Sequence, residues 1–439
     1  MSEWYEEYKE KVSSAIRDER LQLALERATA RFSMARKEAV ASLPYIQWLR
    51  KRAREVKAWS IENLTQLISI LRERAEELGC SFHLSEDSEE LRKYVIKVCS
   101  EHEAQLIIKS KSMVTEEVDL NEALEREGFR VVETDLGEFI VQLRGERATH
   151  MVVPAIHVPK EEVAALFSKA TGRRVSPNVE ALALTARQLL RREFMSADVG
   201  ITGANVIAAE TGTIVILENE GNARFVSNVP PVHVCVAGIE KVVPTIDDAM
   251  AIVQLLPPNA TGQLMACYVS LITGPSRTAD IELTTTIGAH GPRELHLVLL
   301  DNGRSSMILD PNFKEAAYCI RCGACLNVCP VYGKVGGQVM GYRYVGGIGA
   351  IFTAFFHGVE KAAPVAFSCT GCGACVKVCP LEIDVPSMIE KLRQRLVSLG
   401  YAPPPHLKIA EYVESRQNPF GEPVKERISW LKELEEGGY

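Results

Sequence analysis

The sequence lacks any apolar segment long enough to cross a membrane. No uncharged apolar run in its 439 residues reaches the roughly 18 residues that a spanning helix needs. The acidic residues 1–7 contain no apolar run either, so they do not resemble a signal peptide. An excess of positive charge is also missing, because 50 Lys and Arg face 57 Asp and Glu. We therefore expect a cytoplasmic protein with no transmembrane segment and no nucleic-acid partner.

Signatures of the common enzyme classes are scarce as well. The chain has no complete nucleotide-binding fingerprint, no Ser/His/Asp ordering and no metal-binding histidine motif. Hydrophobic residues make up 46% of the chain, which excludes a mostly disordered protein. A chain of 439 residues is too long for one packed core, so we predict two or three globular units.

Residue patterns divide the chain into four segments. Apolar residues at helical spacing predict a helical N-terminal region over 1–78, interrupted at Pro44 and ended by Gly79. Short apolar runs that alternate with helical patterns predict an α/β domain over 79–305. A cysteine-rich unit over 306–400 and a C-terminal tail over 401–439 follow.

Within the α/β domain, short apolar runs indicate the strands and helical spacing indicates the helices between them. The predicted strands are 104–108, 131–132, 139–143, 151–153, 213–217, 232–236 and 294–300. The predicted helices are 88–100 and 176–194. In the second helix we expect Ser176 as the N-cap and Pro177 as the first helical residue.

Eight of the twelve cysteines form two runs of identical spacing. Each run has the form C-x-x-C-x-x-C-x-x-x-C-P, which is the bacterial-type [4Fe–4S] pattern in which the fourth cysteine binds the other cluster. We therefore predict two [4Fe–4S] clusters as cofactors. The expected ligands of one are Cys319, Cys322, Cys325 and Cys379, and those of the other are Cys369, Cys372, Cys375 and Cys329.

A pair of zinc sites is the alternative interpretation of these runs. Four-cysteine zinc sites usually show two separated pairs, whereas each run here places four cysteines within eleven residues, so the spacing favours iron–sulfur clusters. Gly323 and Gly373 lie inside the loops, where small residues let backbone N–H groups approach the cluster sulfides.

The connection between the two runs contains a strongly apolar segment, 348–356, which we predict to be a buried helix. A compact two-cluster ferredoxin would have a shorter connection, so we infer an α-helical ferredoxin domain. The other four cysteines lie in apolar or strand contexts, and we expect them to be ordinary core residues: Cys80, Cys99, Cys235 and Cys267.

Several segments of the α/β domain look too polar to be simple connections. Segment 109–112 (KSKS) follows a predicted strand, and it fits either an anion site or a helix N-cap with solvated lysines. Three carboxylates lie within 133–138, and glycines recur with Asn and Thr over 200–222. His157 is a candidate acid or base, although a lone histidine is more often structural.

Taken together, these segments make the sequence resemble the lactate-utilisation protein B family, the iron–sulfur subunits of bacterial and archaeal lactate-oxidising complexes. The resemblance runs from about residue 55 to about residue 395. The matching segments are 109–118 (KSKSMVTEEV), 132–138 (VETDLGE), 154–157 (PAIH), 203–221 (GANVIAAETGTIVILENEG), 274–280 (GPSRTAD), 288–293 (GAHGPR) and 319–332 (CIRCGACLNVCPVY).

The resemblance implies a fold, partners and a function. It implies an α/β LUD domain, with a ribose-phosphate isomerase/CoA-transferase-like fold, followed by the α-helical two-cluster ferredoxin domain. The implied partners are a cysteine-rich subunit related to heterodisulfide reductase and glycolate oxidase subunits, and a smaller LUD protein. The implied function is electron transfer in an oxidoreductase complex that converts L-lactate to pyruvate. No catalytic residue carries over from the family.

Oxidation of lactate needs a base and benefits from a cationic clamp for the carboxylate. The candidates for the clamp are Arg277, Arg293 and Lys111, and the candidates for the base are His157 and His290. A substrate site on a partner subunit is the alternative.

Two further hypotheses stay open. Segment 417–423, with Arg427 and Trp430, resembles the segment that joins two domains in heterodisulfide reductase-like proteins, or is simply a helix cap and a packed tryptophan. The former interpretation favours a partner-docking tail and an electron relay for another dehydrogenase or a disulfide reductase. A third hypothesis is CoA-transferase chemistry through Glu218 or Glu220.

Overall fold

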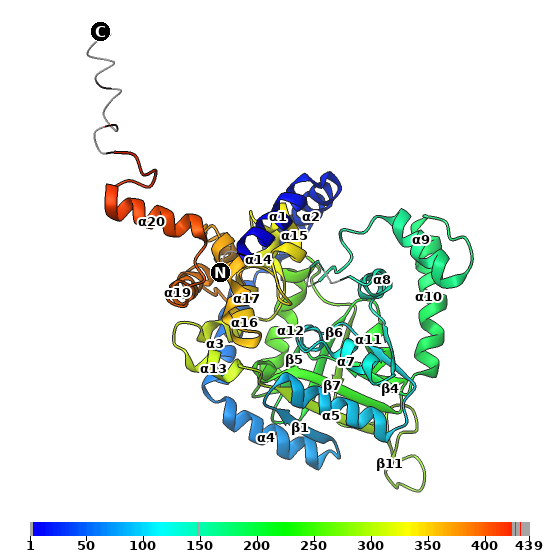
Figure 1. The fold of residues 1–439 in the computed structure, drawn as a ribbon. Coiled ribbons are helices and arrows are strands. Elements are labelled where there is room, and N and C mark those ends of the chain that lie inside the picture. Colours follow the sequence, from blue (N-terminus) through cyan, green and yellow to red (C-terminus); the bar gives the residue numbers. More distant parts are fainter. Residues whose placement is uncertain (1–2, 147–148, 151, 424–425, 427–430, 432–439) are drawn as a thin grey trace.

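The computed structural model describes residues 3–146, 149–150, 152–423, 426 and 431. An α/β body carries a smaller helical unit at one end, and the last helix, α20, points away from both (Figure 1). In this part of the chain, no helix is both long and apolar enough to cross a membrane. Arg427 and Trp430, which the tail hypothesis uses, lie outside the described residues.

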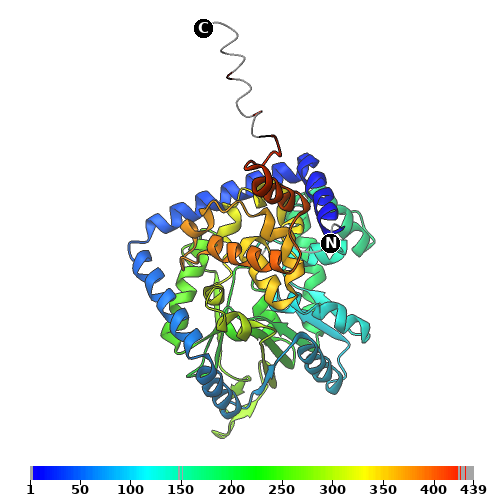
Figure 2. The ribbon, with the colours of Figure 1, turned by 60° about the vertical axis from the view of Figure 1, so that its left-hand side comes forward.

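Helices form the N-terminal region, as predicted. They are α1 (Glu3–Arg17), α2 (Glu19–Ser42), α3 (Ile46–Glu62) and α4 (Leu64–Glu77). The Asp18 side chain caps α2 by accepting from two backbone N–H groups, and Pro44 separates α2 from α3. Figure 2 shows α2, α3 and α4 along the outer edge of the molecule, so this region braces both the helical unit and the α/β body.

A six-stranded parallel sheet forms the centre of the α/β domain, with the order β1-β12-β7-β4-β2-β3. Its strands are β1 (Ser81–Ser85), β2 (Leu106–Lys109), β3 (Arg130–Glu133), β4 (Val199–Thr202), β7 (Val232–Gly238) and β12 (Glu294–Leu300). Every residue of β7 is buried, as expected for a central strand covered on both faces. Val234 packs with the core under α5, whereas Cys235 packs with the core under α4.

The crossover helices cover both faces of this sheet. They are α5 (Ser88–Glu101), α6 (Met113–Glu117), α7 (Leu120–Arg126), α8 (Leu136–Arg144), α9 (Lys160–Thr171), α10 (Val179–Ser196), α11 (Asn222–Asn228) and α12 (Ile246–Ala260). A smaller mixed sheet with the order β8-β5-β6-β9 lies beside it.

The strands of the small sheet are β5 (Val206–Ala208), β6 (Thr213–Glu218), β8 (Val242–Val243) and β9 (Tyr268–Ile272). The 3-10 helix η1 (Ile239–Lys241) links β7 to β8. A two-stranded hairpin, β10 (Arg277–Thr278) with β11 (Thr286–Ile287), protrudes at the far end of the body (Figure 1).

The cysteine-rich unit is helical. Its elements are α13 (Arg304–Leu309), η2 (Lys314–Tyr318), α14 (Ala324–Asn327), α15 (Tyr332–Val339), α16 (Gly346–Phe356), α17 (Val359–Ser368), α18 (Ala374–Val378) and α19 (Val385–Ser398), followed by α20 (Pro404–Arg416). The apolar segment 348–356 lies in the buried helix α16, which confirms the prediction. One continuous core joins Leu49 of α3, Leu255 of α12 and Ile351 of α16, so the three regions fold as one body.

A buried ion network also ties the α/β domain to the helical unit. The guanidinium of Arg304 lies 2.9 and 2.7 Å from the two carboxylate oxygens of Glu117 and 2.6 Å from Glu240 Oε2. Tyr344 donates to Glu117 at 2.6 Å, and Arg321 donates to Glu240 at 3.2 Å. Arg304 is 0% exposed. Because both carboxylates belong to the α/β domain, while Arg304 and its neighbours come from the helical unit, the network fixes one domain against the other.

Two of the strand predictions are wrong. Segment 139–143 lies in α8, because Asp135 caps that helix by accepting from the N–H groups of Gly137 and Glu138. The helix ends at Gly145, which has a φ of +68°. Val152 and Val153 form a loop rather than a strand. The other predicted strands are present, with ends that shift by one or two residues.

Two smaller predictions are also wrong. Helix α10 begins at Val179 and its N-cap is Asn178, not Ser176, because the Asn178 side chain accepts from two backbone N–H groups. Cys80, Cys99 and Cys235 are buried core residues as expected, whereas Cys267 is exposed.

His233 makes the stability of the α/β domain dependent on pH. Burial, and then its neighbour His296, lower the pKa of His233 to about 3. Its Nε2 lies 2.7 Å from Thr202 Oγ1. Below pH 6.5 the unfolded chain therefore binds a proton that the folded chain excludes, so the free energy of unfolding falls as the pH falls.

Between pH 7.5 and 5.0 we expect His233 to account for a loss of about 2 kcal/mol in the free energy of unfolding. Anaerobic urea denaturation of the wild type and of His233→Gln over this range measures it, because glutamine keeps a partner for Thr202 without titrating. The pH dependence should be shallower in the variant. Equal slopes for the two proteins would contradict the assignment.

Candidate functional site

The eight cysteines of the two runs surround two cavities in the helical unit. The first cavity is lined by Cys319, Cys322, Cys325, Cys375 and Cys379. The second is lined by Cys325, Cys329, Cys369, Cys372 and Cys375. The fourth cysteine of each run lines only the cavity of the other run, which is the arrangement that crossed ligation requires.

The donor set of each cavity fits an iron–sulfur cluster. Burial, and then the neighbouring Cys379, raise the pKa of the Cys322 thiol to about 12. Thiolates packed this closely need the positive charge of bound metal ions to stay ionised. The cavities share Cys325, Cys375, Ile348 and Val385 as lining residues, so they are direct neighbours.

The two cysteine loops repeat one backbone conformation. Gly323 and Gly373 precede the short helices α14 and α18 with φ values of +75° and +70°, as the glycines of the two loops predict. Two residues earlier, Gly371 of the second loop has a φ of +67°, whereas the first loop has Arg321 with a φ of +62°. An arginine in a left-handed conformation is strained, which points to a function for its side chain.

Three arginines of α2 and α3 hold the end of the second cysteine run. Arg36 donates to the carbonyl of Val378 at 2.6 Å, and Arg50 donates to the carbonyl of Cys379 at 2.9 Å. Arg54 donates to the carbonyl of Leu381. The N-terminal helices therefore position the residues around the first cavity, a contribution that the sequence did not indicate.

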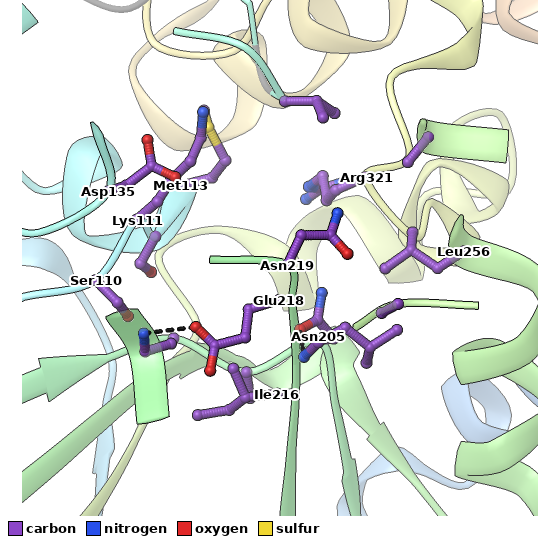
Figure 3. Close-up of a pocket in the computed structure, with 18 of the residues that line it drawn as sticks. Ser110, Lys111, Met113, Asp135, Asn205, Ile216, Glu218, Asn219, Leu256 and Arg321 are labelled. Carbon is purple, nitrogen blue, oxygen red and sulfur yellow. Dashed lines mark hydrogen bonds between the residues drawn. The ribbon is translucent and has the colours of Figure 1, made fainter. Parts of the chain in front are cut away.

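A third and larger cavity, of about 420 Å³, lies between the α/β domain and the first cysteine loop. We call it the interdomain cavity. Its walls come from the carboxyl ends of β2, β3 and β4, from β6 and the turn after it, from η1 and α12, and from Arg321 and Tyr344 of the helical unit. Figure 3 shows Arg321 on one side of it and Ser110, Lys111 and Asp135 on the other. Ligands bind at this edge of open parallel sheets in many proteins.

The cationic side chains of the interdomain cavity differ in their partners. Lys111 Nζ lies 3.2 Å from Glu138 Oε1, but the orientation gives no hydrogen bond. Arg321 donates to Glu240 and lies over the Phe352 ring, 3.7 Å from its centroid. Lys241 makes no hydrogen bond or ion pair within the described part of the chain. Burial, and then Arg321, lower the pKa of Lys241 to about 8.

The carboxylates of the cavity have mostly structural partners. Glu218 accepts from the backbone N–H groups of Ala223 at 2.7 Å and Arg224 at 2.9 Å, so it caps α11. These contacts argue against Glu218 as a nucleophile of CoA-transferase chemistry. Burial, and then repulsion from Asp135, raise the pKa of Glu220 to about 7. Burial alone would raise the pKa of Glu240, but Arg304 and Arg321 hold it well below its usual range.

Of the five candidate residues from the sequence, the structure places only Lys111 at this cavity. His157 lies 2.5 Å from Thr149 Oγ1 and 3.1 Å from Glu146, away from the cavity lining. His290 and Arg293 are exposed in the loop beyond β11. Arg277 donates to the carbonyl of Leu78. None of these four residues lines the interdomain cavity.

The residues of segment 109–112 have two different roles: the first supports the fold, and the other three line the interdomain cavity. Lys109 is fully buried and its Nζ lies 2.8 Å from Glu116 and 2.7 Å from Glu133, so it anchors the end of β2. Burial alone would lower the pKa of Lys109, but these two carboxylates raise it. Ser110, Lys111 and Ser112 line the cavity instead. Arg321 and Lys241 were not among the predicted site residues, although a basic residue inside a cysteine motif and a lysine after a strand were available signals.

Comparisons with known proteins agree with both parts of the chain. A family model described as LUD domain matches residues 68–300, and one described as 4Fe-4S dicluster domain matches residues 315–383. A solved structure of a DUF162 family protein from Deinococcus radiodurans covers 54% of this chain at 16% identity and a TM-score of 0.31, too low to add to the argument.

Curated relatives match most of the chain. Lactate utilization protein B of Shouchella clausii is 40% identical over 82% of this chain and 75% of that protein. Lactate utilization protein B of Bacillus subtilis is 36% identical over 90% of this chain and 81% of that protein. The α/β LUD fold and the iron–sulfur domain that the sequence predicts are thereby confirmed. The chain belongs to the lactate utilization protein B family and is an iron–sulfur protein with a LUD domain and a 4Fe-4S dicluster domain.

Proposed function

We propose that this chain is the iron–sulfur electron-transfer subunit of a complex that oxidises L-lactate to pyruvate. The arrangement of eight cysteines around two adjoining cavities carries the proposal, and the names of the curated relatives supply the substrate. The subunit works in the cytoplasm.

In this proposal, the two cavities of the helical unit hold two [4Fe–4S] clusters with crossed ligation. Cys379 completes the ligands of the first run and Cys329 completes those of the second, because each lines only that cavity. Clusters of this type take up and release one electron each with little movement of their ligands. The backbone of the two loops and the arginines of α2 and α3 keep the thiols in place.

Positive side chains gather around the first cysteine run. The negative charge of a Cys319 thiolate would favour the protonated, cationic forms of three nearby side chains: Lys57, Lys241 and Arg321. By contrast, Cys372 of the second run is exposed. The first site is therefore buried among cations beside the interdomain cavity, while the second reaches the surface, which suits passage of electrons from the interior to a partner.

The proposed partners are a cysteine-rich subunit related to heterodisulfide reductase and glycolate oxidase subunits, and a smaller LUD protein. Helix α20 offers a surface for a partner, because none of its residues is buried. Its apolar side chains Leu407, Ile409 and Val413 are 53%, 45% and 47% exposed. We propose that α20 and the tail after it dock the cysteine-rich subunit.

Anaerobic purification from cells that produce the tagged chain tests this proposal. We expect the cysteine-rich subunit and the smaller LUD protein to co-purify and the assembly to reduce an artificial dye with L-lactate. A matched preparation carrying Cys372→Ser should assemble but reduce the dye at a strongly lowered rate. An assembly with a heterodisulfide reductase-like partner that ignores lactate would instead support the electron relay of another dehydrogenase or disulfide reductase.

A further inference from the structure

Within the interdomain cavity, several hydrogen-bond donors have no partner among the described residues. Lys241 is 8% exposed and forms no hydrogen bond or ion pair with the described residues, although the charges of Glu240 and Cys319 lie near enough to act on it. The hydroxyl groups of Ser110 and Ser112 likewise make no hydrogen bond that the described residues provide. The Asn205 carbonyl oxygen accepts from the N–H of Leu217 at 2.8 Å, and its amide N–H₂ stays available. A buried cation and three neutral donors are thus left for a ligand.

Local structure holds these donors in place. Ser110 and Ser112 follow β2, and Gly203 follows β4 beside them; a methyl group on Gly203 would come within 2.7 Å of Ser112 Oγ. Lys241 ends the 3-10 helix η1, directly after Glu240 of the buried ion network. Because each donor lies in or next to a strand or helix of the packed core, the set is organised before a ligand arrives.

The remaining wall is partly apolar, and Asp135, Glu218 and Glu220 line another part of it. The apolar part would face the alkyl group of a ligand. It is formed by Met113, Ile216, Val236, Leu256, Pro257 and Ala260. The cavity therefore combines a cationic and polar side with a surface that fits an alkyl group. Its volume of about 420 Å³ exceeds what a three-carbon acid fills.

We infer that the interdomain cavity binds the organic acid that is to be oxidised, with its carboxylate at Lys241 and its alkyl group on the apolar wall, and that 2-hydroxy acids longer than lactate also bind. This inference rests on the proposed function for the identity of the substrate class. A buried cation that forms no ion pair with a described carboxylate favours a carboxylate ligand over a neutral one. Arg321, which also lines the cavity, lies between Cys319 and Cys322 in the sequence. An acid bound in the cavity would therefore lie beside the first cysteine run.

Binding can be measured apart from oxidation in the holoprotein with reduced clusters. Dithionite-reduced protein has no capacity to oxidise an added acid, and its unpaired electrons broaden the proton resonances of a nearby ligand. We expect the methyl resonance of L-lactate, and those of 2-hydroxy-4-methylpentanoate, to broaden with the wild type. Lys241→Met should weaken binding by about ten- to a hundredfold, as loss of a charge-assisted hydrogen bond does.

Two comparisons separate a binding role from a structural one. Lys169→Met removes an exposed lysine of α9 and should leave the broadening unchanged. Lys241→Met should unfold near the wild-type temperature, because the substitution removes a buried cation that forms no hydrogen bond or ion pair with the described residues. Lys241→Arg should restore part of the binding.

The outcomes for the inference and for the proposed function are distinct. Equal broadening with the wild type and Lys241→Met, or no broadening by either acid, would overturn the inference even if the assembled complex oxidises lactate. Broadening that depends on Lys241 in a complex that ignores lactate would support the inference and contradict the proposed substrate.

Discussion

Replacing Cys379 with serine is expected to give the electron paramagnetic resonance spectrum of Cys322→Ser, although the two residues belong to different cysteine runs. The reason is that Cys379 lines the cavity of Cys319 and Cys322, while Cys329 lines the other. By the same argument, Cys329→Ser should give the spectrum of Cys372→Ser. Each serine should remove or strongly alter one of the two reduced-cluster signals.

The variants Cys322→Ser and Cys372→Ser serve as references for the other two variants. Cys322 and Cys372 are the second cysteines of their runs, so their variants identify the two signals without any assumption about crossing. Spectra of the dithionite-reduced proteins, with iron counted for each variant, make the comparison. If Cys379→Ser matched Cys372→Ser instead, crossed ligation would be wrong.

Replacing Arg304 with methionine should cost about 3–5 kcal/mol of the free energy of unfolding, because it leaves two buried carboxylates without their shared cation. Arg304 is fully buried and contacts both Glu117 and Glu240. Its guanidinium also lies 4.3 Å from the centroid of the Phe356 ring. Anaerobic urea denaturation followed by circular dichroism measures the loss.

Companion variants make this prediction specific. Arg304→Lys keeps the positive charge but loses the bidentate hydrogen bonding to Glu117. It should therefore be destabilised less than Arg304→Met. Adding Glu117→Gln to Arg304→Met should recover part of the loss, because one buried charge is removed. Arg173→Met, at an exposed arginine, should change the free energy of unfolding by about 0.5 kcal/mol or less. A loss in Arg304→Met no larger than that of Arg173→Met would contradict the role of the network.

The sequence was sufficient to predict the fold class and most of the strands, though not their order in the sheet, because its patterns are local. Continuous apolar runs such as 232–236 give the central strands, and the segment 348–356 gives the buried helix α16. The failure at 139–143 has a physical cause. Its five residues look like a strand, but the Asp135 cap and Gly145 enclose a helical segment, and end signals outweigh a short apolar run.

The candidate site was predicted only in part, because the interdomain cavity is built from segments far apart in the chain. The cysteine runs carry their own spacing, so the grouping of Cys319 and Cys322 was open to prediction. Lys241 and Arg321 become neighbours only when η1 packs on the first cysteine loop. The motif residues His157, His290, Arg277 and Arg293 looked equally promising, yet their contacts lie elsewhere.

Reduction of the clusters by L-lactate tests the central claim most directly. The assembled complex would be held anaerobically with no added acceptor, and its visible iron–sulfur absorbance followed after L-lactate is added, with dithionite as the reference for full reduction. We predict that L-lactate bleaches a large share of the absorbance that dithionite bleaches and that pyruvate appears in proportion. A complex that dithionite bleaches and L-lactate leaves unchanged, with its partners present, would contradict a role in lactate oxidation.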